Sequence, residues 1–104
     1  MLENSEYFNN LFAWYGKLLT DKQQEIMVSY YEEDLSISEI ATNNKVSRAA
    51  VFDAIKRSED LLEHYESKLK VFSKFTLRSE QYKKLKDLKI DQVDEIVELL
   101  EEIE

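Results

Sequence analysis

A row of side chains between positions 48 and 57 has the composition of a nucleic-acid contact surface. Arginine and lysine bind phosphate oxygens, and an arginine near the start of a helix can also reach guanine edges. If this stretch is helical, its period turns Val51 and Ile55 inward and leaves the remaining positions outward. The sequence predicts that the outward row contacts nucleic acid. Its members are Arg48, Ala49, Phe52, Asp53, Lys56 and Arg57.

The same row offers few groups for reading a base sequence. Ala49 and Ala50 bring almost no hydrogen-bonding capacity, although an alanine can touch a thymine methyl group. Asp53 would repel phosphate unless it accepts a hydrogen bond from cytosine. Two interpretations therefore stay open: a surface that binds DNA, and a helix-turn-helix that serves as a protein-packing unit.

A second basic segment follows between two acidic ones. Residues 66–89 carry eight basic and three acidic side chains, whereas residues 1–65 carry six and twelve, and residues 90–104 carry none and seven. Its basic residues alternate with Phe72, Phe75 and Tyr82, a mixture that suits RNA, although a solvated lysine face over a packing stripe is the alternative. The acidic tail could fold back and mask this segment, or cover another subunit. The predicted basic patch consists of Lys68, Lys70, Lys74, Arg78, Lys83, Lys84 and Lys86.

Enzymatic chemistry finds few candidate groups. The chain has one histidine, His64, no cysteine and no glycine-rich phosphate loop. We therefore expect a protein that is not an enzyme and has neither a cofactor nor a metal site. No apolar run approaches the length of a membrane span, and the start of the chain lacks a signal-peptide pattern, so a cytoplasmic protein without membrane insertion is expected.

The elements that position these residues are all expected to be helices, because proline is absent and glycine occurs once. Apolar residues at helical spacing predict helices over residues 5–19 and 21–32 and a short third one from residue 37. Capping boxes at Thr20 and Ser36 and an N-cap at Ser47 predict where three helices begin. The fourth pattern is long, and we expect a break near 73–79 and a last helix capped by Asp91.

Ala41, Lys45 and Val51 have the spacing of a helix-turn-helix, which needs a small residue, a turn residue four positions on and a branched residue ten positions on. Lys45 stands where glycine is usual and must adopt a strained backbone. We expect residues 1–65 to form a helix-turn-helix domain with an aromatic N-terminal helix. Residues 66–104 should form a basic helix and an acidic amphipathic helix, packed on that domain or on a second subunit.

The run LLTDKQQEIMVSYYEEDLSISEIATNNKVSRAAVFDAIKR resembles the promoter-binding region 4 of sigma factors. The whole chain resembles the YlxM (p13) family of small bacterial proteins, through YYEEDLSISEIA, VSRAAVFDAIKR and LLEHYESKL. That resemblance implies a regulatory helix-turn-helix protein of the signal recognition particle (SRP) pathway, with SRP RNA or SRP proteins as partners. A DNA-binding transcriptional regulator and a purely protein-binding scaffold remain alternatives. The apolar stripes of the first helix and of the extension also predict a homodimer, with packing inside one chain as the alternative.

Overall fold

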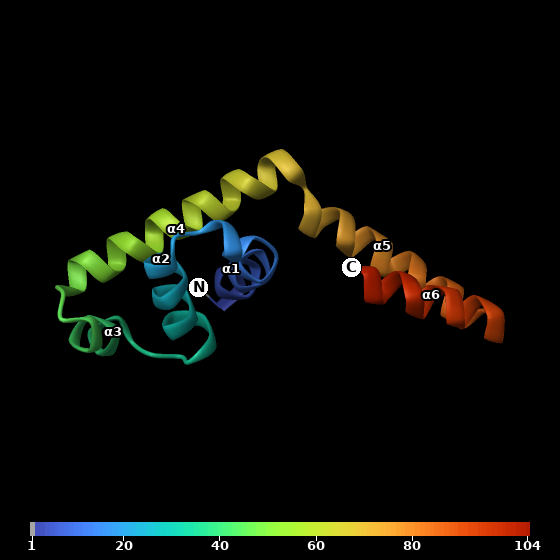
Figure 1. The fold of residues 1–104 in the computed structure, drawn as a ribbon, viewed down its shortest axis with the longest axis horizontal. Coiled ribbons are helices and arrows are strands. Elements are labelled where there is room, and N and C mark those ends of the chain that lie inside the picture. The colour runs from blue at the N-terminus through green and yellow to red at the C-terminus, as the bar shows by residue number, and fades with distance from the viewer. Residues whose placement is uncertain (1) are drawn as a thin grey trace. The chain divides into compact units, whose positions relative to one another are not determined.

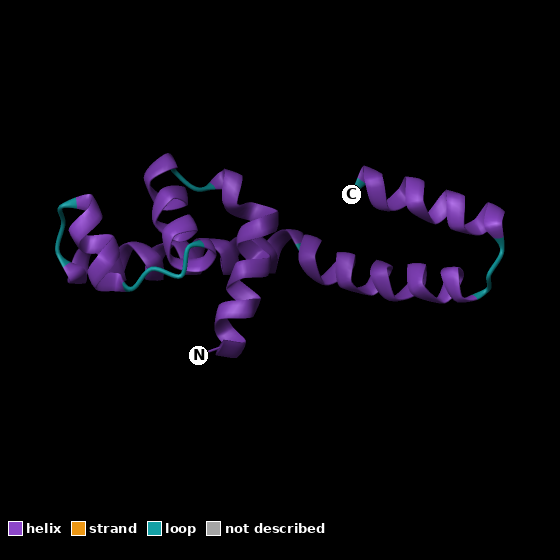
Figure 2. Ribbon diagram, turned by 90° about the horizontal axis from the view of Figure 1, so that it is seen from below, coloured by secondary structure: helices purple, strands orange, loops and turns teal. Residues whose placement is uncertain are grey.

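The computed structural model describes residues 2–104, with side chains from Ser5 onward, and every regular element in that range is a helix (Figure 2). The all-α prediction is confirmed. The chain divides into two compact units between Phe72 and Ser73. The elements are α1 (Leu2–Tyr15), the 3-10 turn η1 (Gly16–Leu18), α2 (Asp21–Met27), the π-helical turn η2 (Val28–Glu32), α3 (Ile37–Asn44), α4 (Arg48–Leu69), α5 (Val71–Asp87) and α6 (Asp91–Ile103).

The first unit is built around α4, which packs against α1, α2 and α3 (Figure 1). Val51 and Ile55 point into this core, as predicted. Full burial of such an aliphatic side chain contributes about 1.5–3 kcal/mol, so a handful of them fixes the position of α4. The side chains with at most 1% exposure in this core are Leu11, Met27, Ile40, Val51 and Leu62.

Three of the predicted helix caps, at Thr20, Ser36 and Ser47, are confirmed by their hydrogen bonds. Thr20 and Gln23 form a complete capping box at α2, and Ser36 and Glu39 form another at α3. The hydroxyl of Ser47 accepts a hydrogen bond from the Ala50 amide at the start of α4. Each cap satisfies backbone donors that a helix leaves open at its first turn.

The turn between α3 and α4 has the expected left-handed residue. Lys45 has φ 56° and ψ 43°, and the Val46 amide donates to the carbonyl of Ala41 at 3.1 Å. Ala41 is 4% exposed, so the small residue does lie within the core of the motif. These features give residues 37–57 the local geometry of a helix-turn-helix.

The expected break near 73–79 is wrong. The chain turns earlier, at Lys70 with φ 55°, and α5 runs without interruption through 73–79. The Val71 amide donates to the Tyr15 hydroxyl at 2.9 Å, and the Phe72 amide donates to the Glu66 carboxylate at 3.0 Å. Because these side chains accept from the first amides of α5, the new helix can begin directly after Lys70.

Two other boundaries also differ from expectation. The first helix ends at Tyr15, and η1 follows it. Gly16, the first residue of η1, lies under the ring of Phe12, where a Cβ would be 2.8 Å from Phe12 Cε1. Asp91 is the first residue of α6 and not its cap; Ile90 holds the cap position without a side-chain hydrogen bond.

The second unit is a helical hairpin in which α6 runs back along α5 (Figures 1 and 2). Arg78 Nε lies 2.5 Å from Glu104 Oε1, and Lys86 Nζ lies 2.6 Å from Glu101 Oε1. The Tyr82 hydroxyl also donates to Glu104, at 2.8 Å. Of the two arrangements considered for the acidic tail, the fold-back on the basic helix is present.

Candidate nucleic-acid interface

The helix-turn-helix presents one face of α4. The Ser47 cap and the Lys45 turn set where α4 begins, and burial of Val51 and Ile55 sets its rotation. Helical geometry then forces the intervening positions outward. All six residues predicted for nucleic-acid contact are exposed, and they span about half of the circumference of α4, with Arg48 and Arg57 at the two edges. They are Arg48, Ala49, Phe52, Asp53, Lys56 and Arg57.

Two of the three cations in this row form ion pairs along α4. Arg57 Nε lies 2.9 Å from Asp53 Oδ2, and Lys56 Nζ lies 3.3 Å from Asp60 Oδ1. All four side chains are 59–74% exposed, so each pair contributes only about 0.2–1 kcal/mol and a phosphate could displace the carboxylate. Among the described residues Arg48 forms no ion pair, and it lies in the first turn of α4. Its guanidinium is therefore the cation of this face without a competing carboxylate contact.

Phe52 is the unexpected member of the row. Its side chain is 62% exposed although it is aromatic. Beside it lies a hollow of about 270 Å³ with a mostly apolar lining from Phe8, Tyr30, Ile37 and Ile55 and a polar rim from Ser5, Lys56 and Glu59. The sequence carries no motif for this hollow, because its walls come from α1, η2, α3 and α4. The combination offers an apolar contact next to the cations.

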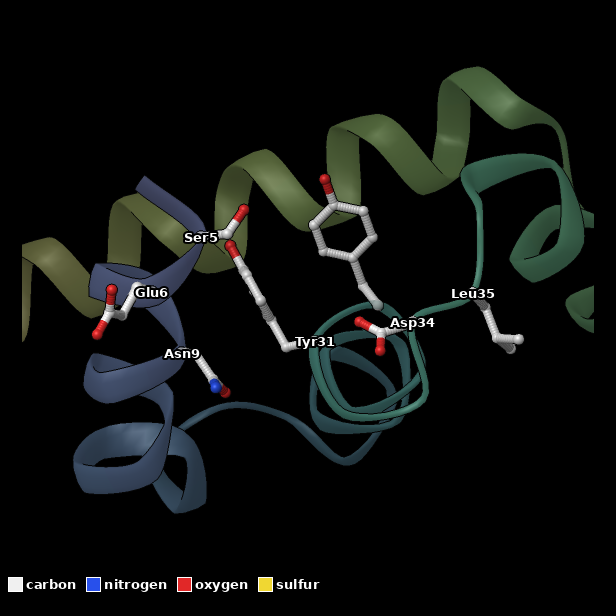
Figure 3. A pocket seen from close by; sticks show the side chains of 7 residues that line it. Ser5, Glu6, Asn9, Tyr31, Asp34 and Leu35 are labelled. Carbon is white, nitrogen blue, oxygen red and sulfur yellow. The ribbon is translucent and has the colours of Figure 1, made fainter. Parts of the chain in front are cut away.

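A larger and more polar hollow, of about 430 Å³, lies between α1 and the end of η2. Figure 3 shows Glu6 and Asn9 on one side of it and Asp34 on the other. The hydroxyl of Tyr31 donates to Glu59, and burial followed by this hydrogen bond raises the pKa of Tyr31. The carboxylates of Glu6 and Asp34 make this larger hollow unfavourable for a phosphate. Within the described part of the chain, no cluster of three or more histidine, cysteine or carboxylate side chains is placed to hold a metal ion.

The basic patch is distributed over both units and around α5. Lys68 and Lys70 belong to the first unit, and the rest lie on α5 in the second. Lys74 and Lys83 are nine residues apart, which places them on opposite sides of that helix. The predicted members on α5 therefore do not form one stripe.

Two of those α5 cations are already engaged by α6. The hydrogen bond from Lys86 to Glu101 raises the pKa of Lys86. The hydrogen bond from Tyr82 is the largest cause of the lowered pKa of Glu104, and Arg78 adds to it. Both shifts favour the charged forms, so the acidic helix competes with any anion at Arg78 and Lys86.

Comparison with known proteins agrees with the motif. The family described as "Putative helix-turn-helix protein, YlxM / p13 like" matches residues 2–103. The chain belongs to this family, UPF0122. The family resemblance predicted from the sequence is thereby confirmed.

Curated members of UPF0122 cover most of the chain. A UPF0122 protein of Bacillus pumilus is 47% identical over 99% of the chain and 96% of its own length. UPF0122 protein YlxM of Bacillus subtilis is 49% identical over 84% of the chain and 79% of its own length. A UPF0122 protein of Malacoplasma penetrans is 54% identical over 74% of the chain and 72% of its own length.

Among the described residues, no helix combines the length and the apolar character that crossing a membrane requires. The contacts of the α4 face, by contrast, remain predictions. Only the exposed side chains of α4 are available for such contacts, because its buried side chains pack against α1, α2 and α3.

Proposed function

We propose that the protein is a regulatory module without catalytic activity that binds nucleic acid through the exposed face of α4. The observation that carries this proposal is the exposure of Arg48 and Lys56 on one side of α4, with Arg57 at the far edge of that side, beside a complete helix-turn-helix core. Phosphate contacts fix the register of such a helix on a nucleic acid, and the small side chain of Ala49 lets the backbone approach closely. The resemblance to YlxM points to the SRP pathway, with SRP RNA as the candidate ligand.

The charge pattern also sets the expected strength of binding. The net charge of −8 opposes association with a polyanion, and two of the three cations on this face must leave their carboxylates first. Binding should therefore depend on a small number of phosphate contacts. With two or three contacts, the slope of log K against log salt is about −2 to −3 for a duplex and shallower for a single strand.

Fluorescence anisotropy with labelled SRP RNA, and in parallel with a random DNA duplex of similar length, tests the proposal at two salt concentrations. We expect Arg48→Ala and Lys56→Ala each to weaken binding and to reduce the salt slope. Lys17→Ala is the matched control, because it removes one exposed lysine charge outside the α4 face. Equal losses for Lys56→Ala and Lys17→Ala would contradict the proposed interface.

The two nucleic acids distinguish the SRP assignment from the DNA-binding alternative. Tighter binding of SRP RNA that persists at the higher salt would support the SRP assignment. Preferential binding of the duplex would support a DNA-binding regulator instead. If Lys83→Ala and Lys84→Ala weaken binding more than the α4 substitutions do, then α5 and not α4 is the contact surface.

A second candidate function is the recognition of a protein, and the exposed Phe52 beside its hollow favours it. An aromatic anchor next to an apolar depression is typical of a protein-binding surface. Phe52→Ala separates the two functions, since it removes the apolar contact and keeps every charge. A variant that still binds nucleic acid but no longer binds an SRP protein would support this second candidate.

A further inference from the structure

The hairpin of α5 and α6 exposes an aliphatic surface that the single chain does not cover. Each of its members is 38–81% exposed, and together they present an apolar area on the order of several hundred Å². An exposed apolar area of that size is at the upper end of what a monomeric protein leaves open. We call this surface the outer apolar face, and its members are Leu77, Leu85, Leu88, Ile96, Leu99, Leu100 and Ile103.

These residues lie on one side of the hairpin. On α6, the spacing of Ile96, Leu99, Leu100 and Ile103 makes a stripe beside the buried Val97. On α5, Leu77 and Leu85 lie to the same side of the line through Tyr82 and Arg78, which faces α6, and Leu88 follows in the turn after α5. Because the two helices are antiparallel, both stripes turn toward the same face of the pair.

The hairpin also has too little core to account for its own order. Among its described residues only Val97 is buried, at 1% exposure. The two helices have 17 and 13 residues, and isolated helices of this length are marginal in water. The ion pairs of Glu101 and Glu104 with α5 join side chains that are 15–44% exposed, and such partly solvated pairs do not replace an apolar core. A partner that covers the outer apolar face would supply the missing core.

We propose that this partner is a second copy of the chain, and that two hairpins pack face to face as a four-helix bundle. Two orientations of a two-fold axis can bring this face onto its own copy. An axis across the helices lays α5 on α5, whereas an axis along the helices lays α5 of one copy on α6 of the other. Residues 73–89 carry six basic and two acidic side chains and residues 90–104 carry seven acidic ones, so charge selects the second orientation.

At the edges of the proposed bundle, basic side chains of α5 again meet acidic side chains of α6. Lys84 borders the outer apolar face on α5, and Glu95 and Glu102 border it on α6. In the selected orientation, Lys84 of one copy lies beside the acidic edge of the other. A standard interface buries about 800 Å² per partner, and the apolar face with these charged edges has that order of size.

Sedimentation equilibrium of the full chain tests the proposal, with circular dichroism to check that helix content is kept. We expect a mass of twice 12.4 kDa for the wild type. The double variant Leu99→Glu/Ile103→Glu should weaken the dimer on the order of 100-fold or more, because it places carboxylates in the dry interface. Both side chains are already exposed in the single chain, at 60% and 81%, so the fold should tolerate them.

Two controls locate and orient the interface. Leu18→Glu places the same charge on a 57% exposed leucine of the first unit and should leave the dimer intact. Lys84→Glu should weaken the dimer, and adding Glu95→Lys and Glu102→Lys should restore it. A monomeric wild type at 100 μM, or a dimer that Leu99→Glu/Ile103→Glu leaves intact, would overturn the proposal. If Lys84→Glu weakens the dimer but adding Glu95→Lys and Glu102→Lys does not restore it, the α5-on-α6 orientation is overturned.

Discussion

Replacing Tyr15 with phenylalanine removes one oxygen atom from the point where α1 meets the start of α5. The Tyr15 hydroxyl donates to Glu66 Oε1 at 2.5 Å and accepts from the Val71 amide at 2.9 Å, and the residue is 3% exposed. In Tyr15→Phe the Val71 amide loses its acceptor. Glu66 keeps the Phe72 amide as a donor but loses the hydroxyl.

The expected loss follows from two changes: the partly buried Val71 amide is left unpaired, and Glu66 loses a hydrogen bond from the hydroxyl. A buried donor left unpaired costs about 1–3 kcal/mol. We expect about 2 kcal/mol for Tyr15→Phe. With a urea m-value of about 1–2 kcal/mol/M for a protein of this size, the unfolding midpoint should fall by about 1–2 M. The fluorescence of Trp14, in the adjacent position of α1, reports unfolding of this unit directly.

Tyr65→Phe is the matched control. It removes the same atom from a half-buried ring that packs against Tyr15, with 6.1 Å between the ring centroids, and it leaves the Glu66 contacts in place. We expect a clearly smaller shift of the midpoint for Tyr65→Phe. Equal shifts for the two variants, or a loss below about 0.5 kcal/mol for Tyr15→Phe, would refute the assigned role of the hydroxyl.

Three further predictions concern backbone strain, close packing and pH. Lys45→Gly should stabilise the protein by up to about 1 kcal/mol because φ is 56° there. Lys68→Gly, in the last turn of α4, should instead destabilise it by up to about 0.5 kcal/mol, and urea titrations of both variants give the two signs. Gly16→Ala should cost about 1–3 kcal/mol by the same assay, since its Cβ would lie 2.8 Å from the Phe12 ring. Burial, and then a hydrogen bond to a neighbouring carboxylate, raise the pKa of Tyr31 above the ordinary 10.0. The protonated Tyr31 hydroxyl therefore stabilises the folded protein fully below pH 10, the ordinary tyrosine pKa, and this stabilisation is lost as the pH rises above 10. Unfolding free energies at pH 8 and 11 should differ more in the wild type than in Tyr31→Phe, and equal differences would count against this assignment.

Local features of the fold were predictable from sequence because short-range chemistry decides them. The Thr20 and Ser36 capping boxes and the left-handed Lys45 involve groups within a few residues of one another. The rotation of α4 followed from the period of Val51 and Ile55, which face the core. The Asp53–Arg57 ion pair has i, i+4 spacing and was open to the same reasoning.

Features that depend on distant residues were not predictable in this way. The end of α4 is set by Tyr15, which is 51 residues from Glu66 and 56 from Val71, and helical periodicity carries no signal of that contact. The hollow beside Phe52 likewise needs walls from four separate elements. Sequence reasoning therefore placed the candidate interface on α4 but missed the apolar depression next to it and put the chain break too late.

Amide chemical-shift mapping tests most directly whether the α4 face is the contact surface. In an isotope-labelled full chain titrated with SRP RNA, or with a DNA duplex if that binds more tightly, the largest changes should fall on the amides of residues 47–57. Residues of α1 and of α2 that face away from this helix should change little. Changes confined to residues 73–104, or the same α4 changes in Arg48→Ala as in the wild type, would contradict the account.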